Sequence, residues 1–499
     1  MNDQQEMTSV KSSDSLCSEH DDDTSRTINE DDLIDSIPMI YEFTDEYLRF
    51  YVLEMHDPKF HTNLENDIIE LVIAQWENTG ICDGIEDDDE QMECLKEHTK
   101  MVCNDYFQLG ISHAPPRSIY YTNPLATAQQ PLSNAHYNNV LRELALVHQP
   151  EQRTKEWYEF RHNLISASSL GKIFGTEASR NRLIYEKCQP LNENRFNGSC
   201  SVASPMHWGQ KYEPLSTMLY EKIHNTKVSE FGCIQHKTYP FIGASPDGIV
   251  TKTDCPRYGR MLEIKNIVNR DITGIPLKDY WIQMQMQMEC CNLDDCDFLE
   301  TRFKEYEQEE EFWNDDSGKR RGIILYFVER VSIYDSGERE SCDEKRPRSN
   351  TYPSLEKDVM DDGQQGYTLA QEYSGIPRYE YMPLDISLTK ENVDTWIEET
   401  RAKLRRSWSL YTTIYWYLEE MSCVLVKRNK LWFEAALPRI RETWDTIEKE
   451  RETGCSHRAP SKKLLIPNLQ VVLNEDNEKE ISNFPSPQGG ICLVKLGET

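Results

Sequence analysis

GASPDGIVTKTDCPRYGRMLEIKN, residues 243–266, places an aspartate in a tight turn and a glutamate–lysine pair on the strand that follows. In SPDG, proline is second and glycine fourth, as a type I turn favours. Apolar residues flank the turn on both sides, so we expect Asp247 to lie between buried strands. Side chains alternate between the two faces of a strand, which predicts Glu263 and Lys265 together on one face. The stretch therefore predicts two carboxylates and one ammonium group close together.

Two interpretations of these residues remain open. Alone, SPDG is typical of a surface turn, and LEIK is typical of a solvated edge strand that carries an ion pair. Together, Asp247 and Glu263 on neighbouring strands could bind one divalent cation, with the Ile264 carbonyl as a further oxygen ligand. Mg²⁺ prefers such oxygen ligands and keeps several water molecules. Lys265 would then orient a metal-bound water or stabilise charge on an attacked phosphate.

A third carboxylate, Glu213, lies in the predicted helix of residues 205–223, beside its apolar face. An isolated glutamate at this position is most often a surface residue. Beside a metal site it would instead bind a second ion. Two ions roughly 4 Å apart can stabilise both the attacking and the leaving oxygen of a phosphate.

In this order, Glu213, Asp247 and the segment Glu263-Ile264-Lys265 resemble the PD-(D/E)XK nuclease signature. More narrowly, the chain resembles the phage lambda-type exonucleases and the YqaJ-like viral recombinases. The match covers roughly residues 150–300. The segments that carry it, in order, are WYEFRHNLISASSLGKIFG, WGQKYEP, GASPDGIV, LEIK and YWIQMQMQMECC.

The resemblance implies an α/β fold: a restriction-endonuclease-like core with a central mixed sheet flanked by helices, and helical additions at both ends. It also implies a Mg²⁺-dependent DNA exonuclease, acting 5′ to 3′ on duplex ends in viral DNA recombination, repair or genome processing. Two Mg²⁺ ions are expected, for which Mn²⁺ could substitute. Double-stranded DNA is the expected substrate, and a single-strand annealing protein is an expected partner.

The resemblance further assigns site residues. It implies metal ligands at Glu213, Asp247, Glu263 and the Ile264 carbonyl, a water-assisting role for Lys265, and completion of the active site by Gln283. Three glutamines, at positions 283, 285 and 287, cannot share one helix face, so we expect only some of them to reach the site.

Arg161, Ser168 and Ser245 align with the residues by which the family grips a 5′-terminal phosphate. A guanidinium fork and hydroxyl groups suit phosphate oxygens. Without this context, Arg161 would be an ordinary exposed helix residue. The chain departs from the family at Asn266-Ile267, where relatives often have Cys-Pro. The long additions leave the oligomeric state open, since smaller relatives form a ring around DNA.

The pattern of composition predicts the domain organisation. We expect a disordered acidic tail over 1–36, a helical region over 37–146, the nuclease core over 147–390 with a polar insertion at 336–376, a helical region over 391–454, and a loop-rich tail over 455–499.

The net charge of -31 argues against nucleic-acid binding by simple charge attraction. The acidic residues cluster, however: residues 1–35 hold eleven acidic and two basic residues. Residues 401–430 hold seven Lys or Arg and two Glu, so RAKLRRSW is either a phosphate-contacting helix or a solvated helix face.

Fifteen cysteines without a CxxC pair predict reduced thiols in an intracellular compartment, which would be the host cytoplasm or nucleus if the protein is viral. The polar, acidic start predicts no signal peptide, and no apolar run is long enough to predict a membrane span.

Two other functions stay open beside the exonuclease. The same metal site could cut DNA internally or at junctions, as a structure-specific endonuclease does. Alternatively, the core could be a catalytically silent DNA-binding or scaffold module. The intact set of three carboxylates and a lysine counts against a silent module.

Overall fold

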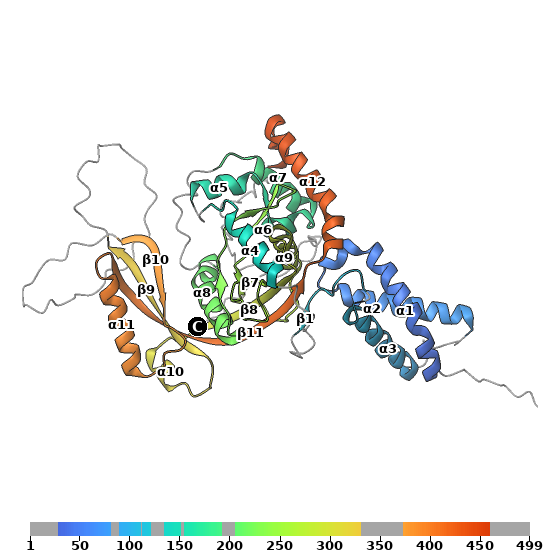
Figure 1. Cartoon of the computed structure of the whole chain (residues 1–499), viewed down its shortest axis with the longest axis horizontal. Coiled ribbons are helices and arrows are strands. Elements are labelled where there is room, and N and C mark those ends of the chain that lie inside the picture. Colours follow the sequence, from blue (N-terminus) through green and yellow to red (C-terminus); the bar gives the residue numbers. More distant parts are fainter. Residues whose placement is uncertain are drawn as a thin grey trace, which may run out of the picture. The chain divides into compact units, whose positions relative to one another are not determined.

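The structure is a computed structural model, and it describes residues 28–80, 89–110, 112–120, 134–150, 154–191, 205–330 and 373–459. Its centre is a curled eight-stranded mixed sheet with helices packed on its faces (Figure 1). The predicted mixed α/β fold with a central mixed sheet is therefore confirmed.

The strand order of the main sheet is β10-β9-β11-β8-β7-β6-β3, and β1 pairs with β11. Only β7 and β8 run parallel; the other pairs are antiparallel. The strands are β1 (Ile119–Tyr120), β3 (Val228–Ser229), β6 (Gly248–Val250), β7 (Met261–Asn266), β8 (Asp295–Glu305), β9 (Arg321–Arg330), β10 (Tyr373–Tyr381) and β11 (Trp408–Lys427).

A smaller sheet of three strands lies beside the first, in the order β2-β5-β4. Its strands are β2 (Ile165–Ser166), β4 (Ile234–Gln235) and β5 (Ile242–Ala244). Because β5 belongs to this sheet and β6 to the main sheet, SPDG is the bend by which the chain passes between two sheets. The prediction of buried strands on both sides of Asp247 is confirmed, but the strands do not form one hairpin.

Strand β7 lies in the interior of the main sheet, between β6 and β8, so the edge-strand interpretation is wrong. Its side chains alternate as predicted. Leu262 and Ile264 pack in an apolar cluster with Tyr220 of the long helix α8, whereas Met261 packs in the larger cluster that contains the buried residues of α9. Glu263 and Lys265 share the face of Met261, and α9 covers that face.

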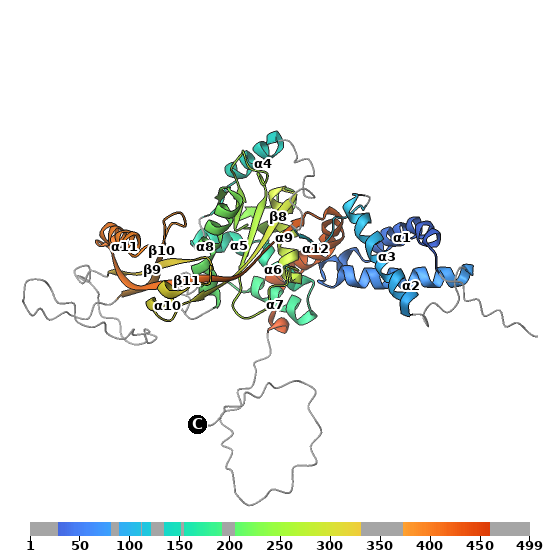
Figure 2. The same ribbon diagram turned by 90° about the horizontal axis from the view of Figure 1, so that it is seen from below.

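Twelve helices are described, and Figures 1 and 2 label them. Around the site lie α5 (Lys155–His162), α6 (Ala167–Leu170), α7 (Glu177–Cys188), α8 (Pro205–His224), α9 (Lys278–Cys291) and α12 (Lys430–Thr453). The others are α1 (Glu30–Phe50), α2 (Phe60–Thr79), α3 (Asp89–Gln108), α4 (Asn134–Leu146), α10 (Glu309–Asn314) and α11 (Lys390–Leu404). No helix among the described ranges is long and apolar enough to cross a bilayer.

The N-terminal helices begin earlier than predicted. Helix α1 starts at Glu30, inside the segment expected to be disordered. Asn29 caps it by accepting a hydrogen bond from the Asp32 amide, and the Asp32 carboxylate accepts one from the Asn29 amide. This capping box and the three acidic residues of the first turn stabilise the start of a helix at a position where composition alone predicts a polar tail. The rest of the predicted tail, 1–27, lies outside the described residues.

The C-terminal region differs most from the prediction. The twenty-residue strand β11 lies within the stretch 391–454 that was expected to be helical, between helices α11 and α12. It pairs with β8 on one side and β9 on the other, so the expected domain boundary at 390 cuts through the central sheet. The basic segment RAKLRRSW spans the end of α11, the turn after Leu404 and the first residue of β11. Most of the polar insertion and of the tail lie outside the described residues.

Candidate active site

Asp247 is held against β7 by the bend between the two sheets. Its Oδ2 accepts a hydrogen bond of 2.7 Å from the backbone amide of Ile264. The chain reaches this position because β6, directly after the bend, pairs with β7 from Gly248 onward. The two carboxylates that the sequence places sixteen residues apart are therefore neighbours.

Glu263 is fully buried, and its carboxylate accepts hydrogen bonds from three side chains. Lys265 Nζ and Gln283 Nε2 donate to Oε1, the latter over 2.7 Å, and Gln287 Nε2 donates to Oε2 over 2.7 Å. Lys265 also lies over the Tyr280 ring, 4.9 Å from its centroid. The lysine is thus fixed beside the carboxylates rather than extended into solvent.

The charges of the site act on one another strongly. Removal from water raises the pKa of Asp247 well above its usual value, and the Glu263 and Glu213 carboxylates raise it further, against the opposing effects of Lys265 and the Ile264 amide. Burial lowers the pKa of Lys265, but Glu263 and Asp247 outweigh this effect and the pKa is raised. A site with this excess of negative charge favours a bound cation.

The donor set fits a hard divalent cation in part. Asp247 and Glu263 supply two adjacent carboxylates, the ligand type that Mg²⁺ prefers. Within the described ranges, however, no group of three or more His, Cys, Asp or Glu side chains is close enough to hold a metal ion. Glu213 is exposed on α8, and its charge acts on Asp247 and on Tyr381. It lies near the pair without joining it as a third ligand.

Helix α8 is fixed to the sheet through Asn266, the last residue of β7. The Asn266 Oδ1 atom accepts hydrogen bonds from Ser216 and Thr301 over 2.7 and 2.8 Å, and its amide donates to the Gly209 carbonyl over 3.1 Å. Gly209 and Ser216 lie on α8, on either side of Glu213 in sequence. Asn266 therefore fixes the position of Glu213 relative to β7.

The glutamines of α9 divide between two faces, as expected. Gln283 and Gln287, one helical turn apart, both reach Glu263. Gln285 points away and bonds the backbone at Lys427 and Asn429. Gln287 was not among the predicted site residues, although its i, i+4 spacing from Gln283 was a usable signal. It also donates to the Ser245 carbonyl over 3.1 Å.

The three residues predicted to grip a phosphate lie in one region. Arg161 Nη2 donates to Ser168 Oγ over 3.3 Å. The Ser245 hydroxyl is buried, and both Ser245 and Arg161 interact with the Cys233 thiol. The convergence follows from the parallel pairing of β2 with β5, which brings the strand before Ser168 beside the strand before Ser245.

Two further cations, not predicted from the sequence, lie beside Arg161. Lys187 Nζ on α7 donates to the Arg161 carbonyl over 2.6 Å, and Arg451 Nη2 on α12 donates to the His162 carbonyl over 2.8 Å. No carboxylate in the described ranges forms an ion pair with any of these three cations. Burial lowers the pKa of Lys187 to about 7, with smaller contributions from Arg161 and Arg451. Arg451 lies 290 positions after Arg161, and no sequence spacing links them.

Comparisons with known proteins agree with the sequence motifs. Residues 156–294 match the YqaJ-like viral recombinase domain, which confirms the resemblance. An uncharacterized protein of Acanthamoeba polyphaga mimivirus is 27% identical over 387 residues, which cover 70% of this chain and 61% of that protein. The chain thus spans less than two thirds of this relative's length.

Two solved structures are also similar. One is LHK-Exo in complex with dAMP, with 18% identity and a TM-score of 0.31 over 60% of this chain and 95% of that chain. The other is the alkaline exonuclease LHK-Exo from Laribacter hongkongensis, with 30% identity and a TM-score of 0.24 over 30% of this chain and 74% of that chain.

Proposed function

We propose that the protein is a metal-dependent deoxyribonuclease that hydrolyses phosphodiester bonds, with its catalytic centre at Asp247, Glu263 and Lys265. The observation that carries the proposal is the pair of adjacent carboxylates, one in the bend before β6 and one on β7, with a lysine bonded to the second. Buried like charges are costly unless they serve a bound cation or a proton. The match to a viral recombinase domain supports the same assignment.

Each residue then has a stated role. Asp247, Glu263 and the Ile264 carbonyl would hold Mg²⁺ or Mn²⁺, which when bound supplies Lewis acidity and an activated water, and Glu213 would serve a second ion. Lys265 orients the attacking water and stabilises the negative charge that develops on the phosphate. Gln283 and Gln287 hold the Glu263 carboxylate in position, so that its oxygens stay directed toward the site.

We further propose that the enzyme works from duplex ends, 5′ to 3′, and holds the terminal 5′-phosphate with Arg161, Ser168 and Ser245. Three observations support an anion site there: the buried Ser245 hydroxyl beside the Cys233 thiol, Arg161 beside the Ser168 hydroxyl, and two added cations, Lys187 and Arg451, that form no ion pair with a carboxylate of the described ranges. A phosphate dianion would balance this local excess of positive charge.

The context that we propose is viral DNA recombination or genome processing, because both the matching domain and the mimivirus relative point to viruses. A single-strand annealing partner and a host cytoplasmic or nuclear location stay predictions.

The proposal is tested with three DNA substrates in Mg²⁺: linear duplex with 5′-phosphates, the same duplex with 5′-hydroxyls, and covalently closed circles. The exonuclease degrades only linear DNA and prefers the phosphorylated ends. Cutting of closed circles would instead establish the endonuclease, and binding without any cleavage would establish the non-catalytic module. Chelation of Mg²⁺ should stop all degradation.

A further inference from the structure

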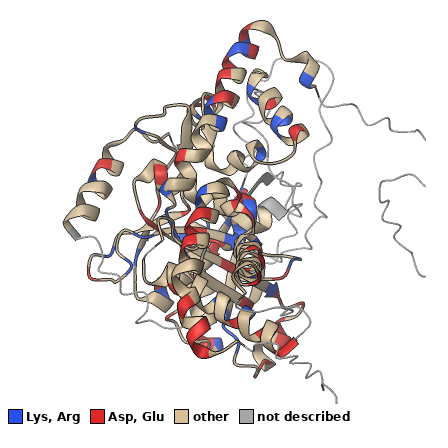
Figure 3. Cartoon of the chain, turned by 90° about the vertical axis from the view of Figure 1, so that its right-hand side faces the viewer, with Lys and Arg blue, Asp and Glu red and all other residues tan. Residues whose placement is uncertain are grey.

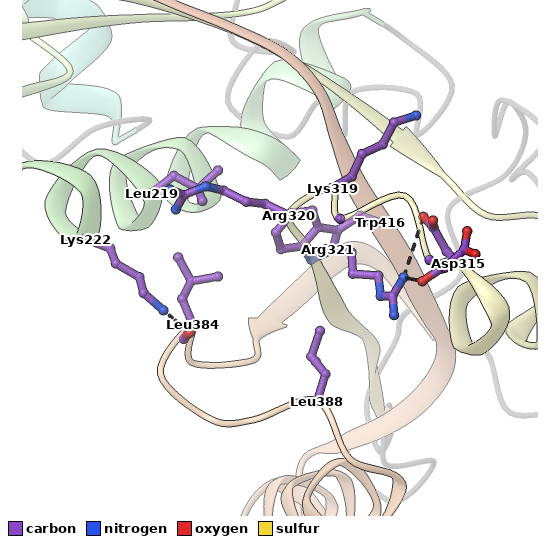
Figure 4. A pocket seen from close by; sticks show the side chains of 11 residues that line it. Leu219, Lys222, Asp315, Lys319, Arg320, Arg321, Leu384, Leu388 and Trp416 are labelled. Carbon is purple, nitrogen blue, oxygen red and sulfur yellow. Dashed lines mark hydrogen bonds and ion pairs between the residues drawn. The ribbon is translucent and has the colours of Figure 1, made fainter.

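A second pocket lies away from the carboxylates, between α8, the turn that precedes β9 and the segment that follows β10. Its volume is about 440 Å³, which is within the range of sites for small ligands. Figure 4 shows Leu219 and Lys222 of α8 on one side, Arg320 and Arg321 on another, and Leu384 and Leu388 opposite. None of these residues takes part in the proposed catalytic site.

The floor and one wall of the pocket are apolar and fixed. Trp416 is 1% exposed, and its ring packs edge-on against Phe303 with centroids 5.5 Å apart. Leu219 is also 1% exposed and belongs to the same cluster. Lys222 Nζ donates to the Leu384 carbonyl, which ties the segment after β10 to α8. Trp416 and Leu219 themselves are covered, and the half-buried Leu384 and Leu388 supply accessible apolar surface against which an organic ring can pack.

The charged side of the pocket has a basic excess in a strongly acidic protein. Four cations and two carboxylates line it: Lys222, Lys319, Arg320, Arg321, Asp315 and Asp316. Arg321 and Asp315 form a pair with nitrogen and oxygen 3.7 Å apart, and Tyr306 also donates to Asp315. Lys319 lies over the Tyr417 ring.

Arg320 differs from its neighbours. It is exposed, and in the described part of the chain its side chain has no hydrogen bond or ion pair. Figure 4 shows it reaching from the turn across the pocket toward Leu219. A guanidinium group in this position can contact a phosphate through two nitrogens at once.

None of the described residues of the acidic helix α10 lines the pocket, although Asp315 and Asp316, which follow it, do. Neighbouring side chains of β11 point to opposite faces of the strand. Phe312 of α10 packs with Tyr415, on the face opposite to Trp416. Trp416 lines the pocket, and Arg321, which also lines it, lies over the Phe312 ring at 5.4 Å from its centroid.

We propose that this pocket binds a nucleotide, with the phosphate on Arg320 and the base against the apolar wall. The choice of a nucleotide among organic anions rests on the proposed nuclease function. Leu219 is six residues after Glu213, or roughly 9 Å along α8 at 1.5 Å per residue. A short stretch of a DNA strand bound at the carboxylates would reach the pocket, and so would a released mononucleotide. Both present a phosphate and a base.

The test measures binding to the full chain in EDTA, so that no cleavage occurs. Two probes are used: dAMP by calorimetry and a fluorescein-labelled ten-nucleotide oligothymidylate by anisotropy. The variants are Arg320→Gln and Arg320→Glu. The matched control is Arg142→Gln on α4, which is also an exposed arginine without a hydrogen bond or ion pair to another described side chain. Titrations are repeated in an Arg161→Ala background, which removes the other proposed phosphate site.

We expect Arg320→Gln to weaken binding roughly 10-fold, as for loss of a hydrogen bond to a charged group, and Arg320→Glu to weaken it more. For the oligonucleotide, the slope of log K against log salt should fall by about 0.7 for the lost phosphate contact. If only the binding of the oligonucleotide is weakened, the ligand is a DNA strand. If only the binding of dAMP is weakened, the ligand is a free nucleotide. Equal binding of both probes by Arg320→Gln and Arg142→Gln overturns the proposal.

The outcome is independent of the nuclease assay. If the protein cleaves no DNA but binds the probes through Arg320, the nucleotide-pocket proposal stands and the nuclease proposal fails. If the protein cleaves DNA but its binding does not depend on Arg320, the nuclease proposal stands and the pocket proposal fails.

Discussion

At the scale of single residues, the site is built from groups that the fold would be more stable without. Asp247 lies close to Glu263, and Lys265 is the positive charge beside them, with the Ile264 amide and two glutamine amides as neutral donors. Proteins keep such arrangements where function needs them, at a cost in stability. This cost can be measured.

Asp247→Asn should raise the unfolding temperature of the metal-free protein while it removes cleavage. The pKa of Asp247 is raised on folding, so folding favours the protonated form, and stability falls as pH rises from its unfolded value through the folded one. Asparagine keeps the acceptor for the Ile264 amide and does not ionise. Thermal unfolding in EDTA should therefore show a larger gain at pH 8 than at pH 4. A loss of stability at pH 8 would contradict the assigned electrostatics.

Lys187 should make phosphate recognition dependent on pH. With a pKa of about 7, its amine is mostly neutral above that pH in the free protein, and a bound phosphate must draw a proton back onto it. The KM for 5′-phosphorylated duplex, relative to 5′-hydroxyl duplex, should rise between pH 7 and 9. In Lys187→Met that ratio should be closer to one and change less. A wild-type ratio that is constant over this range would refute the role.

Residue-level prediction worked where period and pattern carried the information. The alternation of β7 correctly separated Glu263 and Lys265 from Leu262 and Ile264, and the helical period correctly limited how many glutamines reach the site. Lys187 could not be found in this way, because it meets Arg161 through tertiary packing alone.

At the scale of elements, α12 acts as a brace for the helix that carries Arg161. Arg451 bonds the His162 carbonyl, the Asn163 side chain and the Lys187 carbonyl, which joins α12 to the C-terminus of α5 and to α7. Both views of the ribbon show α12 passing close to α7 (Figures 1 and 2). Helix α12, which lies far outside the matched domain in sequence, therefore supports the proposed 5′-phosphate site.

Arg451→Ala should lower both stability and end preference. It leaves two carbonyls without this donor, and a lost hydrogen bond of this kind costs about 1–3 kcal/mol in unfolding free energy. The ratio of rates on phosphorylated and hydroxyl ends should fall toward one as Arg161 loses its support. Lys449→Ala, an exposed neighbour on α12, is the control and should change neither quantity. An unchanged end preference in a destabilised Arg451→Ala protein would show that α12 has a structural role only.

The elements were predicted less well than the motifs. Alternation in LYTTIYWYL is weak because apolar or aromatic residues occur on both faces of β11, and most of them are half-buried. The basic residues just before β11 favour the prediction of a continued helix. Only the long-range pairing with β8 and β9 decides the matter, and sequence spacing does not report such pairing.

At the scale of the whole chain, the charge is strongly acidic but is not gathered on one element. Figure 3 shows Lys and Arg interspersed with Asp and Glu along the described helices. The cation cluster at Arg161 and the basic pocket at Arg320 are local exceptions within a chain of net charge -31. Such a protein should bind DNA through a few defined phosphate contacts rather than through a positive electrostatic potential over its whole surface.

The salt dependence of DNA binding should accordingly be shallow. In EDTA, the slope of log K against log salt for duplex DNA should correspond to only a few phosphate contacts, at about 0.9 per contact. Arg161→Ala should reduce the slope by about one contact, whereas Arg142→Gln should leave it unchanged. A steep slope that is equal in all three proteins would indicate a broad basic surface in place of these sites.

The central claim is that Lys265 and its two carboxylates form a phosphodiester-cleaving site. The most direct measurement is the rate of nucleotide release from 5′-phosphorylated linear duplex in Mg²⁺, compared between the wild-type protein and Lys265→Ala at equal DNA binding. We expect a fall of roughly 10²- to 10³-fold, as for loss of one electrostatic stabiliser of the transition state. A Lys265→Ala protein that releases nucleotides at the wild-type rate would contradict it.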